Sequence, residues 1–220
     1  MKKLLIITLM FNAIFNFLGC KGQSTKTNNT TTNINIQKQI ENSIDAFKNR
    51  PIYKELTLQI LDSVHDVNLE QTIIDNIFSK QDSSGTNEKN YSIIKSLSNG
   101  RQAVFATWGL EAEVNNGGFN QYFYNFSSSG QYAEEARDGF VLIGANKHAN
   151  LTQRAIDLYM KNIKFFEKYK DGTVESFNKS YDNNPLDKLD KEFYTLDSVV
   201  PTSKLRIDYI RNHKNEFIDK

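Results

Sequence analysis

The stretch 108–125, WGLEAEVNNGGFNQYFYN, constrains the fold of this chain more than any other part of it. Before its glycine pair, apolar residues recur at the spacing of one helix face: Val104, Trp108 and Ala112. After the pair, aromatic residues do the same: Phe119, Tyr122, Phe123 and Phe126. Gly117 is placed as the left-handed residue that ends the first helix, and Gly118 lets the chain approach closely. The stretch therefore predicts two helices that meet at a glycine corner.

The rest of the chain continues the helical period. No segment alternates for long with the period of a strand, and three Pro with few Val favour helix over sheet. We therefore predict one all-α domain over residues 36–220, with a polar loop at 81–90 as its weak point. Helical periodicity begins near Ile36, and cap signals place further helix beginnings at Asn68 and Asn150. The helix that opens at Asn150 is expected to run through Tyr169.

The first 35 residues predict an exported, lipid-anchored protein. Residues 1–19 combine Lys2-Lys3 with an apolar run that is too short to span a bilayer, as in a signal peptide. The run ends at Phe17-Leu18-Gly19-Cys20, which resembles the bacterial lipobox, so we expect lipidation at Cys20. A plain signal peptide with an incidental Cys is the alternative. Residues 20–35 are polar and predict a flexible tether in the cell envelope.

The sequence from Glu113 to Asn125, EVNNGGFNQYFYN, resembles a bacterial family of unknown function. That family is typified by the C-terminal domain of a DNA-mimic protein. Two later blocks extend the resemblance over about residues 97–209: Ala136 with Ile143-Gly144-Ala145, and Leu189-Asp190 with Phe193-Tyr194. It implies a helical fold and protein binding rather than catalysis.

The DNA-mimic role itself does not follow from this resemblance, because imitating DNA needs a densely acidic surface. Residues 100–146 carry two basic against five acidic residues, a net charge of −3, and residues 147–220 carry 14 against 12, a net charge of +2. This balance predicts no binding of nucleic acid and no imitation of it.

The polar residues at the corner admit two interpretations. In one, four side chains face a cleft that binds or catalyses: Glu113, Asn116, Gln121 and Asn125. In the other, which we favour, they satisfy the free backbone groups of the two helix ends. The nearby aromatic residues are expected in the core, although a ligand pocket is the alternative. The candidate site comprises Trp108, Glu113, Asn116, Gly117, Gly118, Phe119, Gln121, Phe123 and Asn125.

No catalytic motif accompanies this site. The three histidines lie far apart in the sequence, and no phosphate loop or nucleophile elbow is present, so we expect no metal and no cofactor. The sequence predicts an envelope lipoprotein with a non-enzymatic, helical protein-interaction domain. Its partner is a protein, self-association being one option, and its only link to the membrane is the lipid. The alternatives are a hydrolase or small-ligand protein with a cleft near Glu113, Asn116 and Gln121, and an immunity-type inhibitor of a toxin.

Overall fold

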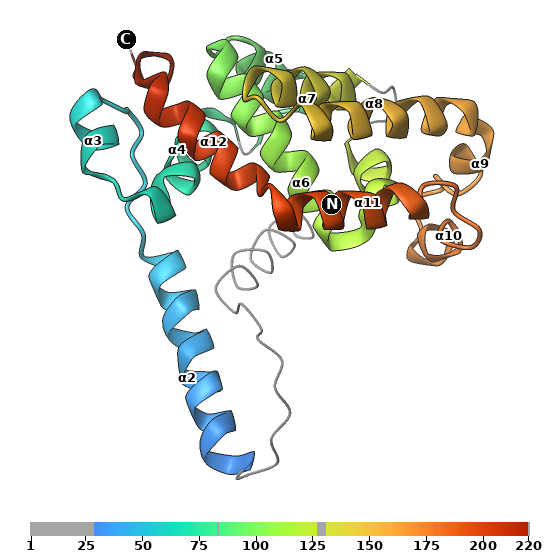
Figure 1. Ribbon diagram of the computed structural model, residues 1–220, viewed down its shortest axis with the longest axis horizontal. Coiled ribbons are helices and arrows are strands. Elements are labelled where there is room, and N and C mark those ends of the chain that lie inside the picture. The colour runs from blue at the N-terminus through green and yellow to red at the C-terminus, as the bar shows by residue number, and fades with distance from the viewer. Residues whose placement is uncertain (1–28, 83, 127–130, 220) are drawn as a thin grey trace. The chain divides into compact units, whose positions relative to one another are not determined.

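The computed structural model describes residues 29–82, 84–126 and 131–219, and Figure 1 shows that their regular structure is entirely helical. The predicted all-α class is therefore confirmed. The chain separates into two units, Met1–Pro51 and Ile52–Lys220. The predicted signal peptide and Cys20 lie outside the described residues.

The described part of the first unit is a single helix, α2, at Asn29–Lys48. It ends just before Arg50-Pro51, as the restricted backbone of a residue preceding proline predicts. Its beginning differs from the prediction, because residues 29–35, assigned to the flexible tether, are helical. Nucleation is the costly step of helix formation, so a helix that forms over the segment beyond Ile36 can extend into polar neighbours.

The second unit contains ten α-helices and one short 3-10 helix within the described residues. They are α3 (Leu58–Ser63), α4 (Asp66–Lys80), α5 (Asn87–Lys95), α6 (Asn99–Asn125), α7 (Gln131–Leu142), α8 (Asn146–Lys161), α9 (Ile163–Glu167), α10 (Val174–Lys179), α11 (Asp187–Val199), α12 (Thr202–Asn212) and η1 (Lys214–Glu216).

Helix α6 is the centre of this unit. Helix α7 packs along it and α8 packs on α7, while α4, α11 and α12 also contact α6 directly (Figure 1). Fully buried side chains from five of these helices form the core between them: Ile73, Val104, Leu110, Phe119, Phe140, Phe193 and Ile210. Packing of this kind supplies most of the stability of a helix in a folded protein.

Two predicted helix starts are wrong. Helix α4 begins at Asp66, with His65 as its N-cap, so Asn68 lies inside the helix and its carbonyl accepts a hydrogen bond from the Thr72 hydroxyl. Helix α8 begins at Asn146 rather than Asn150. In α8 the added turn packs into the core, since His148 and Ala149 are buried, and this packing outweighs a local capping signal. The added turn of α4 is exposed, and Asp66 in it complements the helix dipole.

The predicted long helix through Tyr169 is instead two helices. It breaks at Asn162, where the side-chain amide donates to the Leu158 carbonyl at 2.8 Å. Such side-chain bonds to the backbone compete with the helical ladder. The predicted loop at 81–90 is also shorter than expected, because Thr86 caps α5 from residue 87 onward.

Candidate functional site

The glycine pair bends α6, as predicted, but Gly117 and Gly118 play different roles from those expected. Gly117 has φ −161°, an extended value that any residue adopts, whereas Gly118 has φ +70° and ψ −178°. The left-handed residue is therefore Gly118, and the assignment to Gly117 is wrong. Gly117 is required for space instead, because a Cβ there would lie 2.3 Å from Gln121 Oε1 and 2.6 Å from the Tyr181 hydroxyl.

The backbone groups exposed by the bend are satisfied by side chains from α11 and from the residues after α10. The Phe119 amide donates to Asp190 Oδ1 at 2.8 Å, and the Tyr194 hydroxyl donates to the Val114 carbonyl at 2.8 Å. The Tyr181 hydroxyl donates to the Gly117 carbonyl at 3.0 Å. These three side chains hold both ends of the bend, a task that the sequence assigned to Glu113, Asn116, Gln121 and Asn125.

Glu113, Gln121 and Asn125 bind one another across the bend. The Glu113 carboxylate accepts from Gln121 Nε2 and from Asn125 Nδ2, both at 2.8 Å, and Glu113 is only 3% exposed. Burial raises the pKa of Glu113, and the two amide donors offset part of this effect. Both interpretations of this cluster were therefore incomplete, since it neither ties off helix ends nor faces an open cleft.

Asn116 does not belong to this cluster, because its side chain is exposed at the corner. A neighbouring amide makes a separate connection, since Asn120 donates to the Ser180 hydroxyl at 2.7 Å and so links the second half of α6 to the end of α10. Asn116 and Asn125 are thus the predicted site residues that are exposed to solvent.

Asp190 is the residue that the sequence reasoning missed. Burial raises its pKa to about 6, with the Phe119 amide opposing the shift and Asp187 adding to it. A Cβ on Gly118 would lie 2.2 Å from Asp190 Oδ2, so this carboxylate fills the space that the glycine leaves. Its only signal in the sequence was its place, with Tyr194, in the later block of the family resemblance.

The aromatic residues are core rather than pocket. Phe119 and Phe123 are buried, and the Phe123 ring stacks on Tyr159 with 4.1 Å between ring centroids. Trp108 packs elsewhere, against Phe78 of α4 at 5.9 Å. The structure therefore brings Trp108 into the α4–α6 contact and leaves it out of the corner.

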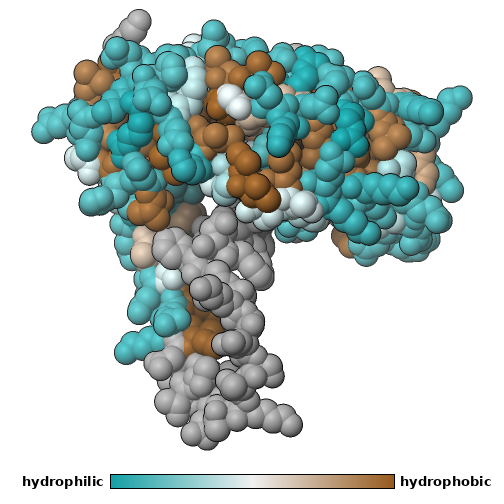
Figure 2. Space-filling model, viewed as in Figure 1, coloured by the Kyte–Doolittle hydropathy of each residue, from teal (hydrophilic) through white to brown (hydrophobic). Residues whose placement is uncertain are grey.

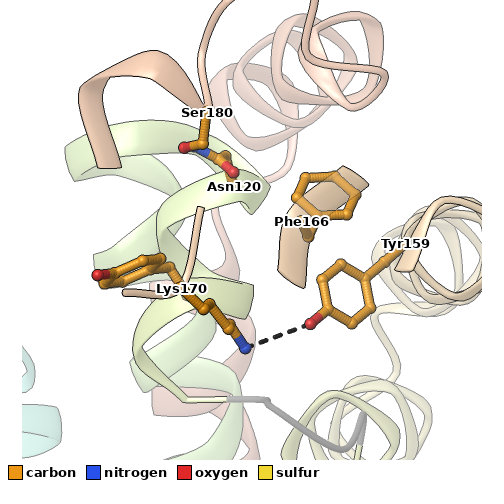
Figure 3. A pocket seen from close by; sticks show the side chains of 6 residues that line it. Asn120, Tyr159, Phe166, Lys170 and Ser180 are labelled. Carbon is orange, nitrogen blue, oxygen red and sulfur yellow. Dashed lines mark hydrogen bonds between the residues drawn. The ribbon is translucent and has the colours of Figure 1, made fainter. Parts of the chain in front are cut away.

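A small pocket lies beside the corner, with room for roughly one water molecule. Figure 3 shows that Lys170 extends toward Tyr159 in this pocket, with Asn120, Phe166 and Ser180 around it. The Lys170 ammonium donates to the Tyr159 hydroxyl and to the Phe123 carbonyl, both at 3.4 Å. The Phe123 carbonyl is one of the last in α6, and a lysine ammonium there complements the negative end of the helix dipole. The position of Lys170 is therefore explained by the fold.

The described residues contain no group of three His, Cys, Asp or Glu side chains placed to hold a metal ion. They also include no helix that is long and apolar enough to cross a membrane.

These features define a class of all-helical domain in which a central helix bends at a glycine pair and side chains of a later helix hold the bend. Residues 95–213, more than half of the chain, match the family described as DMP19-like protein, and the chain belongs to that family. The predicted resemblance over 97–209 is thereby confirmed, with slightly wider limits. No curated protein and no solved structure matches the chain.

Proposed function

We propose that the chain is an envelope lipoprotein whose DMP19-like domain binds a protein partner and does not catalyse a reaction. The signal-peptide pattern of residues 1–19 and the Gly19-Cys20 junction support export and lipidation. A lipid anchor on Cys20 would hold the domain at the membrane, since each buried acyl CH₂ contributes about 0.8 kcal/mol.

One observation supports the non-enzymatic role above all. The two corner carboxylates whose pKa values are raised, Glu113 and Asp190, are both engaged in hydrogen bonds within the domain. A general acid or base has to reach the proton that it transfers on the substrate. Glu113 is 3% exposed, which supports a role in holding the bend together rather than in meeting a substrate.

The partner is proposed to be a protein because the sequence has no strong excess of charge of one sign that would favour nucleic acid or the imitation of DNA. Figure 2 shows hydrophilic residues over most of the visible face, with apolar residues in patches between them. The net charges of −3 over residues 100–146 and +2 over residues 147–220 do not support imitation of DNA. Self-association and inhibition of an incoming toxin are the specific forms of protein binding to be distinguished.

The membrane anchor is tested with Cys20→Ser in the full chain. We expect this variant to lose incorporation of labelled fatty acid and to leave the membrane fraction, whereas the matched variant Ser24→Ala keeps both properties. A Cys20→Ser protein that is still labelled and membrane-bound would contradict the proposal.

Protein binding is tested with a photo-crosslinking residue at Asn116, which is exposed at the corner, and at the control position Asn150, which is exposed on α8. We expect one defined adduct in cells from Asn116 and none from Asn150. An adduct of twice the chain mass indicates self-association, and an adduct that forms only when a toxin is delivered indicates the immunity-type role. The absence of any protein adduct at both positions would contradict the proposal.

A hydrolase or a small-ligand protein is the second candidate, favoured by the raised pKa of Glu113 and of Asp190. It requires the corner to open, since these groups are now engaged with Gln121, Asn125 and the Phe119 amide. Turnover of a panel of ester, phosphoester and peptide substrates tests it. Turnover that is lost in Glu113→Gln would establish this candidate over the binding role.

A further inference from the structure

The small pocket beside the corner contains a lysine whose charge has no carboxylate partner. The Lys170 ammonium has three hydrogens to donate, but its contacts to the Phe123 carbonyl and to the Tyr159 hydroxyl are both 3.4 Å long. An ordinary N–H···O hydrogen bond measures roughly 2.7–3.2 Å, so both contacts are weak. The dipole of α6 supplies only a partial negative charge. In the described part of the chain, the lysines that form ion pairs lie elsewhere, at Lys80, Lys89, Lys95, Lys179, Lys204 and Lys214.

The other polar groups of this pocket also lack an acceptor. Tyr159 is 1% exposed, and its hydroxyl accepts from Lys170 but donates to no acceptor within the described residues (Figure 3). Asn120 donates to the Ser180 hydroxyl, which in turn donates to the Phe177 carbonyl. None of the described residues that line the pocket is an acid. A buried donor without an acceptor is costly, so the pocket is suited to a negatively charged atom that accepts hydrogen bonds.

The surface that leads to the pocket is basic. Residues 161–170 carry four lysines and a single acid, Glu167. The acid that follows Lys170, Asp171, is engaged with the amide and the hydroxyl of Thr173, both at 2.8 Å. Burial lowers the pKa of Lys170, with Glu167 opposing the shift, as expected of an ammonium without a strong partner. The three lysines before Lys170 in this run are exposed and can steer a negatively charged partner to the pocket: Lys161, Lys164 and Lys168.

The size of the pocket selects among negatively charged groups. It has room for roughly one water molecule, and its walls include Tyr124, Tyr159 and Phe166. One carboxylate oxygen is of this size, and the rest of the group can stay at the surface, where Tyr124 and Lys170 are partly exposed. A phosphate group carries three or more oxygens around one centre and is too bulky to enter in the same way. The pocket therefore favours a carboxylate over a phosphate.

We propose that this pocket, together with the basic residues 161–170, binds an acidic segment of the protein partner. One carboxylate oxygen of that segment enters the pocket and accepts hydrogen bonds from the Lys170 ammonium and the Tyr159 hydroxyl. Further acidic side chains of the segment lie along the exposed lysines of the same run. This inference rests on the proposed protein-binding function and adds the chemistry of the partner to it.

Binding is tested on the full chain carrying Cys20→Ser, so that no lipid contributes, with a hexaglutamate peptide that bears a neutral dye. We expect saturable binding by fluorescence anisotropy, and weaker binding of a tri-phosphoserine peptide of similar net charge. No binding of hexaglutamate, or tighter binding of the phosphoserine peptide, would overturn the proposal. Sedimentation with phosphatidylglycerol vesicles is the third measurement. Vesicle binding that is lost in Lys170→Met would assign the pocket to a lipid headgroup and would also refute the acidic segment.

Substitutions in the pocket separate it from general attraction of charge. Lys170→Met is expected to weaken hexaglutamate binding by at least about tenfold, because it removes a charge-assisted hydrogen bond. Tyr159→Phe keeps the ring that stacks on Phe123 and removes only the hydroxyl, so we expect a loss of several-fold. Lys188→Met, at an exposed position of α11, removes the same charge elsewhere and is the matched control. Equal losses in Lys170→Met and Lys188→Met would rule out the pocket as the binding site.

Failure of this inference can be told apart from failure of the proposed function. A protein adduct at Asn116 in cells, combined with unchanged hexaglutamate binding in Lys170→Met, would refute the acidic segment alone. Hexaglutamate binding that depends on Lys170, without any protein adduct in cells, would contradict the protein partner and leave the carboxylate pocket in place. The measurements on the chain with a native pocket do not depend on whether the pocket variants fold.

Discussion

At the scale of single residues, the corner depends on two adjacent glycines that have different structural roles. Gly117 provides space for Gln121 and Tyr181, and Gly118 provides the positive φ and the room for Asp190. The sequence Asn-Asn-Gly-Gly indicates that the helix breaks but contains no information on which glycine is left-handed. That choice depends on Asp190, which lies 71 residues from Phe119 in the chain.

Gly118→Ala is expected to destabilise the fold by at least about 1–2 kcal/mol, the cost of the left-handed conformation for a residue with a Cβ. The clash with Asp190 adds to this cost. Chemical denaturation of both proteins measures the difference. Gly109→Ala is the matched control, because a Cβ there meets nothing within 4 Å and alanine favours a helix by roughly 0.5–1 kcal/mol. Equal stabilities of the two variants would contradict this account of the corner.

Asp190→Asn is expected to change how stability depends on pH. Burial raises the pKa of Asp190 from 3.8 to about 6, so its stabilising contribution is complete below about pH 4 and is lost as the pH rises through 6. An asparagine oxygen still accepts from the Phe119 amide but never ionises. Melting temperatures should therefore shift in favour of Asp190→Asn between about pH 5 and about pH 7. Asp182→Asn, at an exposed position, is the matched control. A pH-independent effect at Asp190 would contradict the prediction.

At the scale of helices, Arg206 joins three elements whose apolar faces also pack together. It pairs with Glu70 on α4 and with Glu111 on α6, and Leu69, Ile73 and Val104 are buried in the same core. In the sequence, Glu70 is one acid among several on a helix. In the fold, its role is to neutralise a buried arginine that lies 136 residues away in the chain.

Arg206→Met is expected to cost about 3–5 kcal/mol, because it leaves Glu70 and Glu111 buried without a compensating charge. The exposed pair of Arg154 with Glu192 offers the matched comparison, and Arg154→Met should cost no more than about 1 kcal/mol. Urea denaturation of both variants at neutral pH measures the two losses. Similar losses in the two variants would contradict the argument that a buried ion pair matters more for stability than an exposed one.

At the scale of the whole molecule, the stable unit extends beyond the residues that match the family. Phe217, after the end of that match, is fully buried. Asp219 accepts hydrogen bonds from the Arg101 guanidinium at 2.7 Å and from the Leu56 amide at 2.8 Å, and it pairs with Lys80 at 2.9 Å. The C-terminal segment thus connects α4, α6 and the chain before α3.

Removal of residues 214–220 is expected to destabilise the second unit by at least about 3 kcal/mol, since it empties the site of a buried phenylalanine and leaves Arg101 without its carboxylate. A fragment of residues 52–220 contains every buried hydrophobic residue of the described part of the chain and is expected to unfold with the midpoint of the full chain. Denaturation of the two truncated proteins in parallel measures both effects. Unchanged stability without residues 214–220 would contradict the role given to Phe217 and Asp219.

Neighbouring residues alone were enough to establish that this chain is helical, where it bends and which family it resembles. Helix period and the glycine pair are local properties, so the all-α class and the bend in α6 could be predicted without coordinates. Asn150 shows the limit of this reasoning, because its cap signal is weaker than the packing of the turn before it, where His148 and Ala149 are buried. Asn68 shows the limit as well, since α4 already begins at Asp66.

What holds the bend, and which acids are buried, became visible only in the assembled fold. Asp190, Tyr181 and Tyr194 reach the corner from 64 to 80 residues further along the chain, and the sequence contains no spacing rule for such contacts. Burial then sets the pKa of Glu113, Asp190 and Asp197, since the cost of removing a carboxylate from water depends on what packs around it. A charge on a helix can therefore be located from sequence, but its environment is a property of the packed helices.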